Sequence, residues 1–471
     1  MAFLRLLGDG HRRCAGWVLE LALLCVALGP AGCGSDDETG GGGTGGSGGT
    51  TTSGTAGGGG SGGSGGAAVF EPTVLFPKTA LEPAELAILV NDQDPQSVAV
   101  GSYYQAARSI PASNVITLSF ATGTVLSPED FATVKSELDA ALTDDIQALA
   151  LTWTAPYRVG CMSVSAAFAL GFDDKYCNTS GEICGVTAAV DYYDSGSARP
   201  FTDHAIRPAM VLAGVTEADV YALIDRGISA DDTFPTGDGY FIRTTDSARS
   251  VRYPSFMGTV ANWDYPGGLE LTYIDNHDGS GSNVIENVDD VLFYLTGLAN
   301  VPSIDTNTYL PGAVADHLTS FGGRLTDSSQ MSIVRWLEAG ATGSYGTALE
   351  PCAITQKFPE TNVLLPHYFR GETLIEAYWK SVWWPGEGNF VGEPLARPWG
   401  AHTVEIVDDT LTIRTTMLDP AKVYELGGAD LEAGPFTVVL GGLTVPHHEL
   451  TTITLEGPGY PFIRLAEAGT P

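Results

Sequence analysis

Short apolar runs alternate with segments of helical periodicity along much of the chain. Ala87–Val90 is an apolar run that predicts a buried strand, and Asp94 followed by Pro95 predicts the start of a helix. Asp caps helix starts well, and Pro is favoured at the first helical position. Two further apolar runs, Asn114–Phe120 and Ile146–Trp153, predict the next strands, with an amphipathic helix between them. Because apolar strands alternate with helices, the pattern predicts a mostly parallel sheet with helices on both faces.

The same alternation resumes after a stretch rich in Gly, Ser, Asp and Tyr. Thr216 predicts a helix start, and Gly227 is expected to end that helix. Three more strands are predicted after it, at Gly239–Thr244, Leu269–Ile274 and Val291–Leu295. The alternation of strands and helices therefore continues well past the middle of the chain.

From Thr403 onward the pattern changes to short alternating runs separated by Gly and Pro, such as Thr410–Thr415 and Phe436–Leu440. Such runs are typical of a small β-sandwich. We therefore expect a doubly wound α/β domain over residues 69–398, followed by an all-β sandwich over residues 399–471. With 44% hydrophobic residues, the chain has enough apolar material for both cores.

Residues 1–33 have the pattern of an export signal, in which arginines precede a short apolar run, Trp17–Leu28, and small residues follow it. The segment Ala31-Gly32-Cys33 resembles a bacterial lipobox, which implies that Cys33 is lipidated and becomes the mature N-terminus. Ordinary secretion, with Cys33 removed or free, is the alternative. Gly34 after the cysteine favours the outer membrane of the cell envelope. Residues 34–68 are rich in Gly, Ser and Thr and predict a flexible tether.

The charge of the chain excludes one class of partner. Asp and Glu total 56 against 23 Lys and Arg, a formal net charge of -33, which repels the phosphates of nucleic acid. The acidic, Gly-rich turn at Asp275–Gly281 does not have the spacing of a calcium loop. The sequence therefore predicts no cofactor, no metal and no nucleic-acid partner, and contact with a membrane only through the lipid anchor.

Four cysteines lie in the part of the chain that is expected to fold: Cys161, Cys177, Cys184 and Cys352. In an exported protein an even number of cysteines predicts disulfides, here two, and three connectivities are possible. A metal site is the weaker alternative, because the spacings contain no paired Cys-x-x-Cys knuckle. The same argument speaks against Cys352 as a nucleophile.

Polar residues gather at the ends of predicted strands. Asp92 and Asp94 follow the first strand, and the stretch Pro311–Cys352 is predicted to form strand, Gly-rich loop, helix, second strand and second polar loop. Its polar residues near strand ends are His317, Thr319, Ser320 and Glu350. In an open α/β sheet, ligands bind outside the carboxyl ends of the strands, so these loops predict a crevice.

Two interpretations of this crevice stay open. On an extended strand His317 and Thr319 face one side and Asp316 the other, and Ser320 meets His317 only if the strand turns there. A catalytic site would pair Ser320 with His317 and orient the imidazole through Asp316 or Glu350. A structural site would use a hydrogen-bonded His and a hydroxyl-lined turn to hold the loops together. We favour the structural interpretation.

Three tryptophans near the end of the α/β region differ in expected role. Trp379 fits the apolar face of a predicted helix and is expected in the core. Trp383 and Trp384 stand outside that periodicity, beside Pro385, and are candidates to contact a ligand such as a sugar ring.

Five motifs along residues 86–398 resemble an uncharacterised bacterial family that co-occurs with exosortase, a membrane enzyme that sorts exported proteins. They are VNDQDPQSVAVGSYYQAARSIPASNV, GAVADHLTSFGG, QMSIVRWLEAGATGSYGTALEPC, GETLIEAYWKSV and VGEPLARP. The resemblance implies family membership and no particular activity. The chain is also faintly similar to caspase-like cysteine peptidases of the gingipain type, which carry His at one strand end and Cys at the next. The matching places here hold Thr296-Gly297 and Thr319-Ser320.

Two functions follow as hypotheses. The first is a binding or scaffold lipoprotein of the cell envelope that holds a polysaccharide or an exported protein partner, in keeping with the exosortase-associated resemblance. The alternative is a surface hydrolase, caspase-like or of the Ser/His type, that acts on peptides or matrix polymer. We favour binding, because the Cys/His pair is absent from the expected strand ends.

Overall fold

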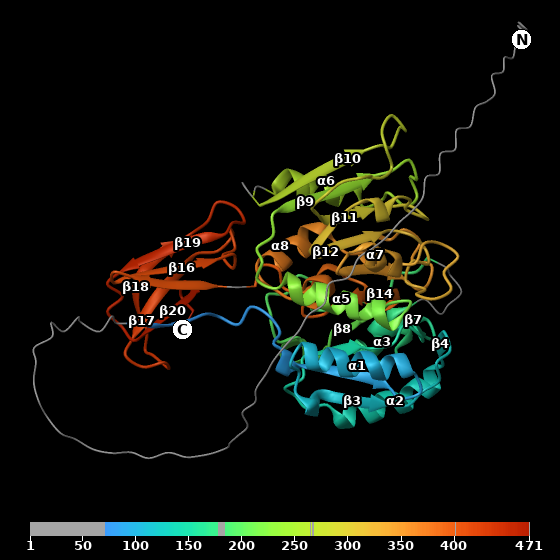
Figure 1. Ribbon diagram of the computed structural model, residues 1–471, viewed down its shortest axis with the longest axis horizontal. Coiled ribbons are helices and arrows are strands. Elements are labelled where there is room, and N and C mark those ends of the chain that lie inside the picture. The colour runs from blue at the N-terminus through green and yellow to red at the C-terminus, as the bar shows by residue number, and fades with distance from the viewer. Residues whose placement is uncertain (1–70, 178–183, 264, 266–267, 401, 471) are drawn as a thin grey trace, which may run out of the picture. The chain divides into compact units, whose positions relative to one another are not determined.

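The computed structural model describes residues 71–470, apart from 178–183, 264, 266, 267 and 401. The expected signal peptide, lipidation at Cys33 and the tether at residues 34–68 all lie outside the described residues. The described chain is a mixed α/β structure with a ten-stranded mixed sheet and further small sheets. This confirms the α/β class (Figure 1).

The large sheet has the strand order β10-β9-β11-β12-β13-β14-β8-β5-β2-β3. Its strands are β2 (Leu86–Asn91), β3 (Val115–Leu118), β5 (Ala148–Leu151), β8 (Ala209–Val211), β9 (Gly237–Arg243), β10 (Leu269–Asp275), β11 (Val291–Thr296), β12 (Tyr309–His317), β13 (Gly343–Thr347) and β14 (Gly388–Gly392).

The sheet is built from two similar halves. In the order β3-β2-β5-β8 and again in the order β10-β9-β11-β12, neighbouring strands are parallel, and the first strand in sequence lies between the second and the third. Strand β13 is parallel to β12 and antiparallel to β14. Strand β14 contacts β8 where Val391 lies opposite Val211. Strands β13 and β14 therefore lie between the two halves, and Figure 1 shows the halves on either side of β14.

The helices of this part are α1 (Pro95–Ala107), α2 (Pro128–Ala141), α3 (Val164–Leu170), α4 (Pro200–His204), α5 (Glu217–Ala230), α6 (Tyr253–Asn262), α7 (Val334–Ala339), α8 (Thr361–Phe369) and α9 (Leu374–Ser381). Single 3-10 turns lie at Pro83–Glu85, Ala112–Asn114, Asp174–Tyr176, Ile304–Thr306, Thr355–Lys357 and Pro385–Glu387. A small sheet joins β4 (Val125–Leu126), β6 (Arg158–Val159) and β7 (Met162–Ser163). Helix α1 packs on β2 and α5, and α6 packs on β9, β10 and α8.

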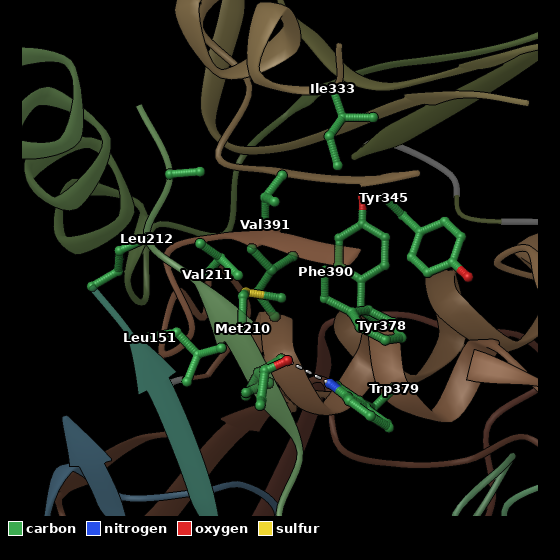
Figure 2. Packing of buried hydrophobic residues seen from close by; sticks show 14 of the residues in the cluster. Leu151, Met210, Val211, Leu212, Ile333, Tyr345, Tyr378, Trp379, Phe390 and Val391 are labelled. Atoms are coloured by element: carbon green, nitrogen blue, oxygen red, sulfur yellow. Dashed lines mark hydrogen bonds between the residues drawn. The ribbon is translucent and has the colours of Figure 1, made fainter. Parts of the chain in front are cut away.

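The core of the α/β part lies where aromatic side chains of α9 meet strands β8 and β14. Trp379 is fully buried, stacks on Phe390 at 4.5 Å between ring centroids, and donates from Nε1 to the Ala209 carbonyl at 2.9 Å. Figure 2 shows this hydrogen bond among the packed side chains, Met210 and Val391 among them. The core role predicted for Trp379 is confirmed.

Several predicted boundaries hold and one fails. Asp94 caps α1 by accepting from the Gln96 amide, and Pro95 is the first helical residue, as predicted. Helix α5, however, runs through Gly227 to Ala230. The glycine is needed for packing instead, because a Cβ at Gly227 would lie 2.5 Å from Cγ of Glu393.

The chain beyond residue 402 forms two small sheets around one core. One sheet contains β15 (Thr403–Val407), β16 (Thr410–Thr415) and β19 (Thr451–Glu456). The other contains β1 (Thr73–Leu75), β20 (Phe462–Glu467), β17 (Tyr424–Ala429) and β18 (Thr437–Leu443). Leu411 and Ile413 from the first sheet share a core with Leu426 and Ile463 from the second. Strand β1 therefore belongs to this module, whereas the sequence placed residue 73 in the α/β domain.

Candidate functional site

Loops that follow strands of both halves converge at the start of β14. The Asn389 side chain is buried and donates from Nδ2 to the Tyr157 carbonyl at 2.8 Å and to the Gly323 carbonyl at 2.9 Å. Tyr157 follows β5 and Gly323 follows β12. The gathering of strand-end loops that the sequence predicts is therefore present.

His317 is a structural residue in this arrangement. It is 1% exposed, and its Nδ1 accepts from Trp336 Nε1 at 2.9 Å, which leaves Nε2 to donate to the Met331 carbonyl at 3.1 Å. Burial lowers the pKa of His317 to about 3, so the ring stays neutral. Both ring nitrogens are engaged away from Ser320 and Thr319, and the hypothesis of a Ser320/His317 pair is wrong.

His317 predicts an acid dependence of stability. Its folded pKa is depressed, so between about 6.5 and about 3 the unfolded chain binds a proton that the folded chain does not. We expect the free energy of unfolding of the wild type, relative to His317→Gln, to fall by about 1.4 kcal/mol for each pH unit below about 6. Urea unfolding at pH 7 and pH 5 measures this difference. A difference between the wild type and His317→Gln that is the same at both pH values would refute the assignment.

Asp316 forms a buried ion pair rather than orienting a histidine. It is 1% exposed and accepts from Nη2 of Arg252, which is itself 3% exposed and also donates to the Thr296 carbonyl at 2.9 Å. Burial raises the pKa of Asp316, and the charge of Arg252 opposes that rise. Arg252 thereby connects the ends of the neighbouring strands β11 and β12.

The remaining hydroxyl and carboxyl candidates hold loops. Thr319 is buried, donates from Oγ1 to Gln330 Oε1 at 2.8 Å and accepts from Arg249 Nε at 3.1 Å. The Ser320 carbonyl accepts from Thr347 Oγ1 at 3.2 Å. Glu350 accepts from the Cys352 amide at 2.9 Å. None of these contacts forms a nucleophile and base pair.

At Thr296-Gly297, where the resemblance to gingipain-type peptidases would place a histidine, the structure leaves no room for a side chain at Gly297. A Cβ at Gly297 would lie 2.0 Å from the carbonyl oxygen of Arg249, closer than real contacts allow. Thr296, the preceding residue, is buried, and its Oγ1 has no hydrogen-bond partner among the described residues. The backbone itself therefore excludes a histidine at this position.

Asp92 and Asp94 lie in the loop that follows β2, in the first half of the sheet. Asp92 is exposed and accepts from Gln93 Nε2 at 2.7 Å. Asp94 caps α1 and lines a pocket of ≈ 480 Å³ formed by the loops that follow β2, β5 and β8, together with residues of the β12–α7 loop. This pocket lies where an open α/β sheet places ligands, but Asp94, its one carboxylate, is used to cap α1.

Trp383 and Trp384 form part of an aromatic surface, which we define as Trp383, Trp384 and Tyr193. Trp383 is 43% exposed, and its ring centroid lies 5.8 Å from that of Trp384 and 6.1 Å from that of Tyr193. Burial raises the pKa of Tyr193 to about 12, and the nearby Glu360 carboxylate adds to that rise. An exposed aromatic group of this kind is suited to stacking on a flat, polar ligand.

A pocket of ≈ 410 Å³, here the Arg252 pocket, adjoins the aromatic surface. Its polar lining residues are Arg252, Ser255, Asn262, Thr355, Glu360 and Asn362. Glu360 links the pocket to Tyr193, and the neighbouring Gln356 carbonyl accepts from the Trp384 amide at 2.9 Å. The structure thus brings Trp383 and Trp384 beside a polar pocket.

The sequence did not predict a role at this site for Arg252, Tyr193 or Glu360. Their parts of the chain lie far apart in sequence and carry no motif that marks them, so only folding brings them together.

A hydrogen bond between Ser195 Oγ and His204 Nε2 at 2.9 Å was also not predicted from the sequence. Within the described residues, no carboxylate is hydrogen-bonded to Nδ1 of His204, so this pair lacks the third group of a catalytic triad.

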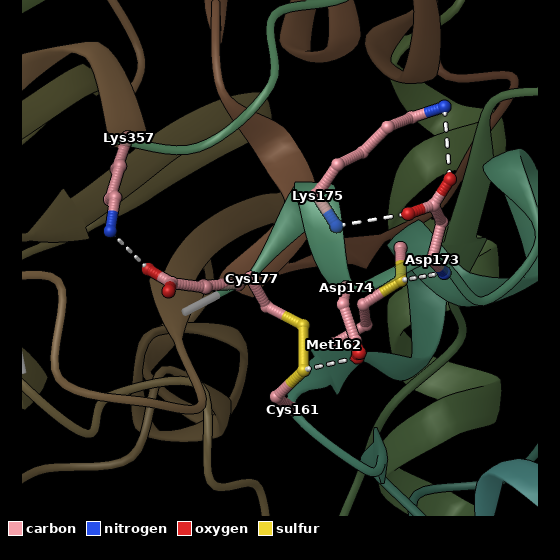
Figure 3. The surroundings of a disulfide bond; sticks show 8 residues. Cys161, Met162, Asp173, Asp174, Lys175, Cys177 and Lys357 are labelled. Atoms are coloured by element: carbon pink, nitrogen blue, oxygen red, sulfur yellow. Dashed lines mark hydrogen bonds and ion pairs between the residues drawn. A yellow bond between two sulfur atoms is a disulfide. The ribbon is translucent and has the colours of Figure 1, made fainter. Parts of the chain in front are cut away.

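Both expected disulfides are present. Cys161 pairs with Cys177 and Cys184 pairs with Cys352, with Cα–Cα distances of 5.7 Å and 5.2 Å. Figure 3 shows the first bridge beside Asp174 and the loop that carries Lys175. The pairing, which the sequence left open among three connectivities, indicates that the protein matures in an oxidising, non-cytoplasmic compartment.

Comparison with known proteins identifies no relative of this chain. No family model, curated protein or solved structure matches this chain. Among the residues that the structure describes, no helix combines the length and apolar character needed to cross a bilayer. Likewise, no group of three or more His, Cys, Asp or Glu side chains in that part of the chain is placed to hold a metal ion.

Proposed function

We propose that this protein is a binding protein of the cell envelope that holds a polysaccharide on the aromatic surface and in the adjoining Arg252 pocket. The observation that carries the proposal is the exposure of Trp383 next to Trp384 and Tyr193 at the edge of a polar pocket. Sugar rings offer apolar faces for aromatic stacking and hydroxyls for hydrogen bonds. The pocket supplies hydroxyl, amide, carboxyl and guanidinium partners within a volume typical of ligand sites.

Trp383→Ala tests this proposal. We expect the affinity for a recognised oligosaccharide to fall about tenfold or more, because exposed aromatic anchors carry much of the energy of such interfaces. Isothermal titration calorimetry on the mature chain measures the change. Tyr103→Ala is the matched control, because Tyr103 stacks on Tyr221 at 4.1 Å on α1 and α5, away from the site. An equal loss in both variants, or no loss in Trp383→Ala, would remove the aromatic surface from the function.

The proposed location rests on the N-terminal sequence. Cys33 in its lipobox-like context, followed by a Gly-rich tether, supports a lipid anchor, and Gly34 supports the outer membrane. Cys33→Ser should move the protein from the membrane fraction to the soluble fraction in its native host. Unchanged partitioning of this variant would count against the anchor and leave the binding site untouched.

We further propose that the large sheet is doubly wound and caspase-like, without caspase-like chemistry. The adjacent parallel strands β11 and β12, and the antiparallel neighbours β13 and β14, support such an arrangement. Membership of the exosortase-associated family, suggested by the five motifs, fits an envelope function. An experimental structure superposed on peptidases of that type tests the fold.

The hydrolase alternative has less support. His317 is neutral and saturated with hydrogen bonds, and Gly297 leaves no room for a histidine at the neighbouring strand end. An exported protein partner, rather than a polysaccharide, is the remaining candidate, and the oligosaccharide titrations separate the two.

A further inference from the structure

His367 is a buried histidine with a carboxylate on each side of its ring. Its side chain is 4% exposed, Nδ1 lies 2.7 Å from Oε1 of Glu372, and Nε2 lies 3.0 Å from Oδ1 of Asp194. An ionised carboxylate only accepts hydrogen bonds, and a neutral imidazole carries a single N–H. Because both ring nitrogens face a carboxylate oxygen, both contacts are hydrogen bonds when the ring is an imidazolium.

The neighbours of His367 favour this charge. The fully buried Lys380 places Nζ 2.7 Å from Oε2 of Glu372, so Glu372 lies between two cations. Burial by itself would raise the pKa of Glu372, but Lys380 and His367 outweigh it, and that pKa is lowered. Burial also opposes the charge of His367, but Glu372 and Asp194 raise its pKa above the usual value of 6.5. Asp194, His367, Glu372 and Lys380 therefore form a chain of alternating charges.

The other charged and titratable groups around the ring are neutral or have partners of their own. His367 lines a pocket of ≈ 400 Å³, which gives protons a route to the ring. Three cations line the same pocket, and each is paired with an anion, namely Lys78 with Glu85, Arg370 with Asp419 and Lys422 with Glu467. Burial lowers the pKa of His448 to about 4 and raises that of Tyr192, so both stay neutral near pH 7. Glu376 accepts from Thr373 Oγ1 at 2.6 Å. His367 is therefore the group whose charge changes as the pH rises from 6.5.

Asp194 connects this chain of charges to the aromatic surface. It directly follows Tyr193, whose ring lies beside that of Trp383. Its amide donates to the Lys380 carbonyl at 2.9 Å, and the Val190 amide donates to the Trp383 carbonyl at 3.2 Å. The turn at residues 190–194, here the Tyr193 turn, is thus held against the segment that carries Trp383 by two backbone hydrogen bonds and by the Asp194 side chain.

Loss of the proton releases Asp194 rather than Glu372. An unpaired buried carboxylate costs more free energy than an exposed one, which water solvates. The Glu372 side chain is 10% exposed, whereas that of Asp194 is 62% exposed. The one N–H of the neutral ring therefore stays with Glu372. The Nε2 lone pair then faces the Asp194 carboxylate, and the side-chain contact that holds the Tyr193 turn becomes repulsive.

We propose that His367 is a positioning residue of the aromatic surface, and that its imidazolium, through Asp194, holds Tyr193 beside Trp383. The surface is then assembled while His367 is charged, and it loosens as the pH rises. This inference rests on the proposed polysaccharide function and adds the regulation of its site. Since the folded pKa of His367 is raised, its contribution to stability is complete below about pH 6.5 and is lost as the pH rises through the folded value.

Amide hydrogen exchange of the Tyr193 turn between pH 6 and pH 9 tests the positioning without a ligand. After correction for the intrinsic exchange rate, we expect protection of the turn in the wild type to fall about tenfold over this range, and that of α1 to stay constant. His367→Gln, which has donors on one atom only, should show the low protection at every pH. Asp194→Asn is the matched variant at an exposed position. Its amide can donate to a neutral Nε2 or accept from a charged one, so protection should stay high throughout.

Calorimetric titration of the mature chain with cellohexaose, laminarihexaose, mannohexaose and N-acetylchitohexaose tests the consequence for binding. None of these glycans titrates between pH 6 and pH 9. A glycan that binds the wild type at pH 6 should bind about threefold or more weakly at pH 9, and Asp194→Asn should bind it equally at both.

The outcomes separate the positioning role from the proposed function. Protection of the Tyr193 turn that is independent of pH in the wild type, or that falls equally in Asp194→Asn, overturns the role of His367. Binding by the wild type that is equal at pH 6 and pH 9 overturns the regulation and leaves polysaccharide binding in place. The expected protection pattern without binding of any of the four glycans supports the role of His367 and counts against the polysaccharide function.

Discussion

Arg252→Met is expected to lower the free energy of unfolding by about 3–5 kcal/mol. The loss comes less from the missing attraction than from Asp316, which would stay buried without the only hydrogen-bond donor that reaches it from the described part of the chain. Replacing both partners, in Arg252→Met/Asp316→Leu, should restore most of the stability, because a buried ion pair and an apolar pair of similar volume are often close in energy. Urea unfolding of the two variants and the wild type measures both changes.

Arg249→Met is the matched control for this experiment. Arg249 lies three residues earlier and pairs with Asp246 at 2.7 Å, but the side chains of both are about one quarter exposed. A partly exposed pair contributes about 0–1 kcal/mol, and the hydrogen bond from Arg249 to Thr319 about 1 kcal/mol more, so this variant should destabilise clearly less than Arg252→Met. If Arg252→Met is no more destabilising than Arg249→Met, the charge of Asp316 is not buried in solution as the structure places it.

The order of strands and helices could largely be predicted, because it depends on local patterns. The apolar run before Asp94 and the pair Asp94-Pro95 mark β2 and the start of α1 without reference to any distant residue. Several elements without such signals were missed, among them α8 and β14. Helix α8 contains Pro366 and has no side-chain cap. Strand β14 begins and ends in glycine, and a Cβ at Gly388 would lie 1.8 Å from the Tyr345 hydroxyl.

The candidate site depended on contacts that the sequence does not encode locally. His317 was correctly placed near a strand end, but its role is set by Trp336 and by the Met331 carbonyl, which reach it through the loop and helix after β12. The partner of Asp316 is Arg252, 64 residues earlier, and no spacing rule connects them. Trp383 could be selected because it broke the helical period, which is a local signal.

The bridge between Cys184 and Cys352 should contribute more to stability than any other covalent link among the described residues. It joins positions 168 residues apart, whereas the bridge between Cys161 and Cys177 joins positions 16 apart. In the chain-entropy model, closing loops of these lengths stabilises the fold by about 5 and about 3 kcal/mol. Cys184→Ala/Cys352→Ala is therefore expected to lower the free energy of unfolding by about 2 kcal/mol more than Cys161→Ala/Cys177→Ala, as measured by urea unfolding.

Binding gives this prediction a second readout. Cys352 stands three residues before Thr355, and the segment from Thr355 to Asn362 forms one wall of the Arg252 pocket. Releasing Cys352 loosens the start of that wall, so Cys184→Ala/Cys352→Ala should also weaken oligosaccharide binding at a temperature where it is still folded. The Cys161→Ala/Cys177→Ala variant is the control, because neither of its positions lines the pocket. Equal affinity in both double variants would mean that the pocket wall holds its shape without the long-range bridge.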